Sequence, residues 1–202
     1  MNTIRTQKQK TRRLVQLSLL SAIIVVLQAL ALGSSIWLQT SINLTLIPIA
    51  LGAMILGPSA GAFLGAVCGV VVLVCGVFNF DKFTGILFQN NPFITAAICL
   101  VKTTVAGWVA GVIYRLLKEK LPKASVFIVS ALVPIINTGL FILGAFLIAD
   151  TIQGNFGTGN YANVFIFIAL GLAVPGFVLE FPLNVALSPA LRYIQKIVQK
   201  KH

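Results

Sequence analysis

Residues 43–78 read NLTLIPIALGAMILGPSAGAFLGAVCGVVVLVCGVF, without a single charged side chain. A helix needs about 20 apolar residues to cross the hydrocarbon core of a bilayer. Within this stretch Gly57, Gly61, Gly65 and Gly69 recur at intervals of four, which places them on one face of a helix. The stretch therefore predicts membrane helices with a face of small residues that permits close helix packing.

The composition of the whole chain extends this prediction. Of its 202 residues, 58% are hydrophobic and 9% are charged, whereas about a quarter of a soluble domain is charged. We expect a single all-α integral membrane domain with six transmembrane helices, the first of which is too long to be a cleaved signal peptide. The six apolar runs lie at 14–32, 43–57, 59–78, 92–115, 125–149 and 163–191.

Pro58 is the only residue between the second run and the third. This leaves two alternatives, a tight re-entry between two spans or a span that is broken within the membrane. The runs leave three loops on one side, near 33–42, 79–91 and 150–162.

The basic residues predict which side faces the cytoplasm. Thirteen of the fifteen Lys and Arg residues lie in residues 1–13, at 115–123 where the fourth run ends and the fifth has yet to begin, or in the tail at 192–202. Positive residues concentrate in cytoplasmic segments. We therefore expect both termini in the cytoplasm and a multi-pass protein of the bacterial plasma membrane.

The inventory of reactive side chains excludes several function classes. The sequence has no P-loop for ATP, and its single histidine is the terminal His202. Neither a catalytic constellation nor a metal site is predicted, so we expect no enzyme and no cofactor. The positive charge favours anionic lipid headgroups over nucleic acid in so apolar a chain. Cys68, Cys75 and Cys99 lie inside apolar runs and are interpreted as small core residues.

Three polar side chains fall at membrane depth and are candidate ligand contacts: Lys102, Asn137 and Glu180. A charge near the bilayer centre costs about 2.5–3.5 kcal/mol on insertion scales and usually faces a bundle interior or a cavity. Lys102 and Glu180 either pair with each other or serve a ligand.

The outer loops add candidate ligand contacts, and the sequence leaves their role open. Trp37, Gln89, Asn90 and Asn91 would lie over the mouth of the bundle and suit a neutral or weakly charged organic solute. Alternatively, the tryptophan is an interfacial anchor and the amides cap helices. Small residues also allow two readings, packing within the bundle or docking of a partner protein.

Several of these stretches resemble the substrate-binding S-component of energy-coupling-factor (ECF) vitamin transporters. Residues 42–65, INLTLIPIALGAMILGPSAGAFLG, are similar to the second-helix pattern IPIALAGMLFGPxxGAxxG of that family. The QNNP sequence at 89–92 and the NTG sequence at 137–139 are also similar to its vitamin-binding members. The family's Ala-xxx-Ala docking motif falls on Ser18 and Ala22, with serine in place of the first alanine.

The resemblance implies capture of a water-soluble vitamin from outside the cell. It implies as partners a transmembrane coupling subunit and two cytoplasmic ATPases that supply the energy. Residues 14–78 would face the partner, with Ser18, Ala22, Gly61, Gly65 and Gly69 as docking positions, and residues 79–191 would hold the ligand.

The substrate is a separate expectation. Because the positive charge of Lys102 would attract an anionic group such as a carboxylate, we expect pantothenate as the substrate, with cobalamin, folate and riboflavin as alternatives. Two rivals to the transporter-subunit interpretation are a stand-alone ion-coupled carrier of a small organic solute and a membrane enzyme that acts on lipid.

Overall fold

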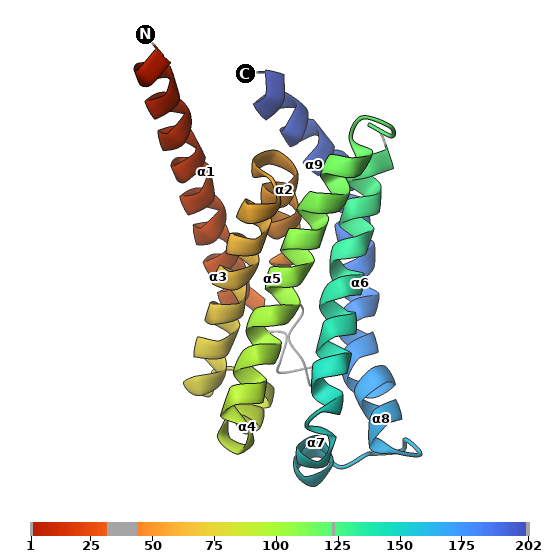
Figure 1. Ribbon diagram of the computed structural model, residues 1–202. Helices are drawn as coiled ribbons and strands as arrows, with labels where there is room; N and C mark the ends of the chain where they lie inside the picture. Colours follow the sequence, from red (N-terminus) through yellow and green to blue (C-terminus); the bar gives the residue numbers. More distant parts are fainter. Residues whose placement is uncertain (1, 32–43, 123, 201–202) are drawn as a thin grey trace.

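The computed structural model describes residues 2–31, 44–122 and 124–200, and these residues are mostly helical with no β-strand (Figure 1). The predicted all-α fold is confirmed. The elements are α1 (Asn2–Ala31), α2 (Leu46–Leu56), α3 (Pro58–Val77), α4 (Lys82–Asn90), α5 (Pro92–Leu117), α6 (Ala124–Phe146), α7 (Ala149–Phe156), α8 (Val164–Ile166), the π-helical segment η2 (Phe167–Ala173) and α9 (Val174–Lys200).

Among the described residues, five helical stretches are long and apolar enough to cross a membrane. They are Gln9–Ala31, Pro58–Val77, Pro92–Leu117, Ala124–Phe146 and Val164–Ala186. The second predicted run is the short helix α2, which has 11 residues and is therefore about 16 Å long. Because the hydrocarbon core is about 30 Å thick, α2 spans roughly half of it. The chain is an integral membrane protein, and its described residues contain five candidate full-length spans and one shorter apolar helix.

The junction between α2 and α3 resolves the alternatives at Pro58. Gly57 alone separates the two helices, with φ 97° and ψ 180°, and Pro58 occupies the first helical position of α3. A positive φ is accessible to glycine without the steric cost that a Cβ brings. The guanidinium of Arg115 lies where a side chain at this position would be. Two separate helices are thus joined by a tight turn.

Both ends of the described chain lie at one end of the bundle, together with the connection from α5 to α6 (Figure 1). The helices α4, α7 and α8 lie at the opposite end. The three basic segments therefore gather at one end, as the charge pattern predicted, and the positive-inside rule makes this end cytoplasmic.

Helices α3 and α5 form the closest contact of the bundle. A Cβ added at Gly61 or Gly65 would overlap the backbone carbonyl of Gly107 or Thr103, and one at Gly69 would lie 2.5 Å from the Cys99 carbonyl oxygen. The Thr103 hydroxyl donates a hydrogen bond of 2.7 Å to the Gly65 carbonyl oxygen. The glycines of α3 therefore pack inside the chain, and the second reading, a docking face for a partner, does not apply to them in this structure.

The outer segments differ from the predicted loops. The segment predicted as a loop at 79–91 contains α4, and the one at 150–162 contains most of α7. The Asp81 side chain caps α4 by accepting hydrogen bonds from the Phe83 amide, at 3.2 Å, and the Thr84 hydroxyl, at 2.7 Å. Both helices are too short and too polar to produce a membrane-length apolar run, which is why the hydropathy pattern missed them.

Candidate functional site

A pocket lies between the outer helices and the middle of the long helices, with about 780 Å³ of space between atoms when its open mouth is counted. It is lined by residues of seven helical elements, among them Val72 of α3, and by Asp81, which precedes α4. The lining includes Gln28 of α1, Phe83 and Thr84 of α4, Thr95, Cys99 and Lys102 of α5, Asn137, Thr138 and Phe141 of α6, Leu172 and Ala173 of η2, and Gly176, Phe177 and Glu180 of α9.

Lys102 enters this pocket from α5, ten residues after Pro92 and therefore about 15 Å from the outer end of that helix. Its Nζ lies 5.2 Å from the centre of the Phe141 ring. A cation over an aromatic ring is stabilised by about 0.5–2 kcal/mol. This contact uses none of the three ammonium N–H donors, so the ring leaves the cation able to bind an anion.

Three polar atoms in the pocket lining are buried and have no hydrogen-bond partner among the described residues. They are Gln28 Oε1, Thr95 Oγ1 and Asn137 Oδ1. The three side chains are only 2%, 2% and 5% exposed. Burying a polar atom without a partner costs about 1–3 kcal/mol in proteins. Their convergence on one pocket is the arrangement expected of a site that completes its hydrogen bonds with a ligand.

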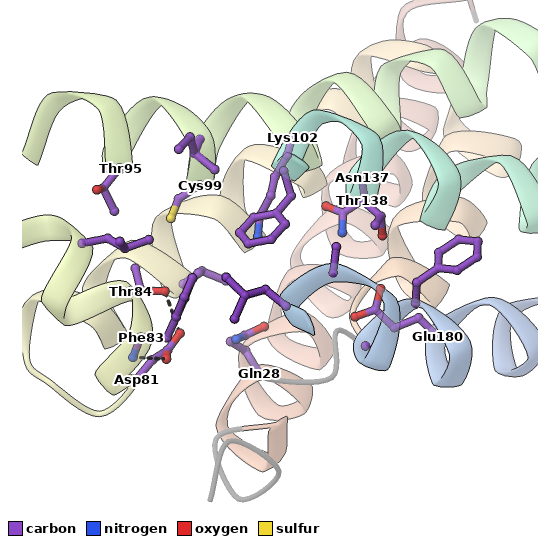
Figure 2. A pocket seen from close by; sticks show the side chains of 18 residues that line it. Gln28, Asp81, Phe83, Thr84, Thr95, Cys99, Lys102, Asn137, Thr138 and Glu180 are labelled. Carbon is purple, nitrogen blue, oxygen red and sulfur yellow. Dashed lines mark hydrogen bonds between the residues drawn. The ribbon is translucent and has the colours of Figure 1, made fainter. Parts of the chain in front are cut away.

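Two acidic side chains also line the pocket. Asp81 is 4% exposed and Glu180 is 5% exposed, and Figure 2 shows them on different sides of the site. Asp81 is engaged in capping α4. Glu180 comes from α9 and shares the pocket with Lys102. A site with a cation and acids around an apolar middle fits a small polar organic molecule.

The structure brings Lys102, Asn137 and Glu180 together in this pocket (Figure 2), as expected for a common site. Gln89, Asn90 and Asn91 are not among the residues that line this pocket, so their contact with a ligand stays a prediction. Asn90 bonds the Ile86 carbonyl oxygen within its own helix at 2.8 Å, and Asn91 donates to the Thr151 hydroxyl at 2.5 Å. Asn91 thus joins the start of α5 to α7. Trp37 lies outside the described residues.

The docking positions divide into two groups. Ser18 and Ala22 are exposed on α1 and remain predicted partner contacts. Gly61, Gly65 and Gly69 are buried between α3 and α5, so their docking assignment is corrected to internal packing. Cys68 and Cys99 are 0% and 4% exposed, as expected of core residues, and Cys99 also lines the pocket.

Sequence reasoning missed five polar contributors to the pocket, one of which, Thr138, directly follows the predicted Asn137. Thr84 and Thr95 gave no signal, because threonine is common in membrane helices. Asp81 followed by an amphipathic segment was a helix-start signal that went unused. Gln28, a lone amide within an apolar run, was the clearest missed signal, since an uncompensated amide in hydrocarbon is costly.

The fold and pocket define a class, a helical membrane protein with a closely packed α3–α5 pair and a pocket with polar side chains within its outer half. A family model described as "ECF transporter, substrate-specific component" matches residues 12–192. The chain belongs to this family, and it serves substrate uptake in an ECF system as a binding subunit. No curated protein matches the sequence.

Proposed function

We propose that this chain captures a water-soluble vitamin with a carboxylate group, pantothenate in the first place, and delivers it to the cell interior. The energy would come from a transmembrane coupling subunit and two cytoplasmic ATPases. One observation carries the proposal: the Lys102 ammonium shares a pocket with three buried polar atoms that have no partner among the described residues.

The charge of Lys102 supports an anionic substrate. A hydrogen bond that involves a charged group contributes about 1.5–3 kcal/mol, more than a neutral one. Pantothenate would place its carboxylate at Lys102 and its amide and hydroxyl groups near Asn137, Thr95 and Gln28. Folate also carries carboxylates and riboflavin offers a polar ring, so both remain competitors. Cobalamin also stays an alternative, because uncharged parts of a ligand could meet the same polar side chains.

Separate energising subunits follow from what this chain contains. Its sequence has no P-loop, so ATP hydrolysis would take place on other polypeptides. The exposed small residues Ser18 and Ala22 on α1 offer a surface on which a transmembrane partner could pack closely.

Calorimetric titration of the purified protein tests the substrate. Pantothenate should bind, and panthenol, in which an alcohol replaces the carboxylate, should bind at least tenfold more weakly. The variant Lys102→Met should lose most of this difference. Binding of folate or riboflavin in place of pantothenate would correct the substrate, and no binding of any vitamin would contradict the proposed function.

An ion-coupled carrier is the second candidate, because the buried carboxylates Asp81 and Glu180 line the same pocket and buried acids often bind coupling cations. Liposomes that contain this chain alone separate the two candidates. Uptake driven by a proton or sodium gradient without ATPases would favour the carrier.

A further inference from the structure

The ligand pocket receives one side chain from α1, the helix that carries the predicted docking positions. Helix α1 packs chiefly against α3 and α2. Its buried side chains form one stripe, Leu20, Ile24, Gln28 and Ala31, and most of its remaining described surface is exposed. Gln28 is the polar member of this otherwise apolar stripe.

An apolar residue at this position would avoid the desolvation of an amide. Gln28 is 2% exposed, and its Oε1 atom has no hydrogen-bond partner among the described residues. A glutamine with a purely structural role would satisfy its carbonyl oxygen by accepting a hydrogen bond from a neighbouring helix. The Gln28 side chain instead lines the pocket, across from Lys102 and Asn137 (Figure 2).

We propose that Gln28 binds the ligand directly and that the bound ligand thereby ties α1 to the wall formed by α5, α6 and α9. This inference rests on the proposed function, because it takes the pocket to be the substrate site. The chemistry of Gln28 requires a neutral hydrogen-bonding group of the ligand, a hydroxyl or an amide, at the end opposite the anion held by Lys102. In pantothenate, the hydroxyl-bearing end meets this requirement.

Helix α1 would connect the ligand pocket, through Gln28, to the predicted docking positions on its exposed surface. Ser18 and Ala22 are exposed and lie about 15 Å and 9 Å along the helix from Gln28 at 1.5 Å per residue. A ligand that fixes Gln28 also restricts the helix that presents these positions. Occupancy of the pocket would thus be communicated to the docking surface through α1.

The test compares Gln28→Met with Gln16→Met. Methionine keeps much of the size of glutamine but lacks its hydrogen-bonding groups, and Gln16 is a partly buried glutamine of the same helix that does not line the pocket. Pantothenate, folate and riboflavin are titrated into the wild-type protein, and the vitamin that binds is used with the variants. We expect binding about tenfold weaker in Gln28→Met and changed by less than about twofold in Gln16→Met.

Two further measurements separate a ligand contact from a structural role. In the absence of ligand, Gln28→Met should keep or raise the melting temperature, because it removes a buried polar atom without a partner. Saturating ligand should slow hydrogen exchange in residues 20–31 of the wild-type protein several-fold. Ligand at the same multiple of each variant's Kd should slow hydrogen exchange in these residues of Lys102→Met but not of Gln28→Met. Only Gln28→Met loses the link between the ligand and α1.

Unchanged affinity in Gln28→Met would overturn the proposal, as would a ligand-free melting temperature several degrees lower than that of Gln16→Met. If no vitamin binds the wild-type protein, the proposed function fails. The ligand-free melting temperature then still decides the role of Gln28, because a fall would establish a structural role and a rise would support an unfilled contact.

Discussion

Gly65 holds α3 against α5, and its replacement by alanine should measurably destabilise the protein. The new Cβ would overlap the Thr103 carbonyl oxygen and would lie 2.6 Å from the Thr103 carbonyl carbon and 2.8 Å from the Thr104 Cα. These are backbone atoms, so no side chain can rotate away. The two helices must separate, and the hydrogen bond of 2.7 Å from the Thr103 hydroxyl to the Gly65 carbonyl oxygen lengthens.

The expected magnitude follows from these contacts. Overpacking costs about 1–3 kcal/mol, and the weakened hydrogen bond costs about 0.5–1.5 kcal/mol. The better helix propensity of alanine returns up to about 1 kcal/mol. Gly139→Ala is the matched control, because no atom lies within 4 Å of a Cβ built there, and it should be neutral or stabilising. The two variants should differ by about 2–4 kcal/mol.

Thermal unfolding in detergent measures this difference. With about 2–4 °C per kcal/mol for a chain of this size, Gly65→Ala should melt roughly 5–15 °C below Gly139→Ala. Equal melting temperatures would refute the close α3–α5 contact. A normal melting temperature together with loss of transport would restore the docking interpretation of this face.

Three more predictions concern the pocket, the cytoplasmic end and the energy source. Lys102→Met should weaken vitamin binding at least tenfold in a folded protein. If Lys102 and Glu180 pair with each other instead, Lys102→Met and Glu180→Gln should each lower the melting temperature. The double variant should then restore it. The Gln195 amide donates a hydrogen bond to the Tyr114 hydroxyl and so joins α9 to α5. Tyr114→Phe should therefore lower the free energy of unfolding by about 1–3 kcal/mol and leave the affinity for the vitamin unchanged. A large loss of that affinity would contradict this prediction. In liposomes the chain alone should bind its vitamin without accumulating it, and ATP-independent accumulation would contradict a separate energy source.

The sequence predicted those features that composition and periodicity control. The long apolar runs and the basic clusters determined the all-α class and the end at which the termini gather. The glycine period in α3 predicted a close helix contact. The glycine period could not show which helix packs against α3, because Gly65 would pack equally well on a helix of this chain or on a helix of another protein.

Other features depend on tertiary contacts that no local pattern reports. The pocket joins Lys102 and Asn137 to Gln28, which lies far away in the sequence and comes from the half of the chain expected to face the partner. The sequence could not decide the role of the amides at 89–91, because an asparagine that bonds its own helix and one that faces a ligand are identical in sequence. Only the packing of α4 and α7 distinguishes them.

Mass spectrometry of small molecules that co-purify with the detergent-solubilised protein tests the central claim most directly. We expect one water-soluble, carboxylate-bearing vitamin, pantothenate first, at close to one molecule per wild-type chain and strongly depleted from Lys102→Met. A lipid or an uncharged solute retained equally by both proteins would contradict it.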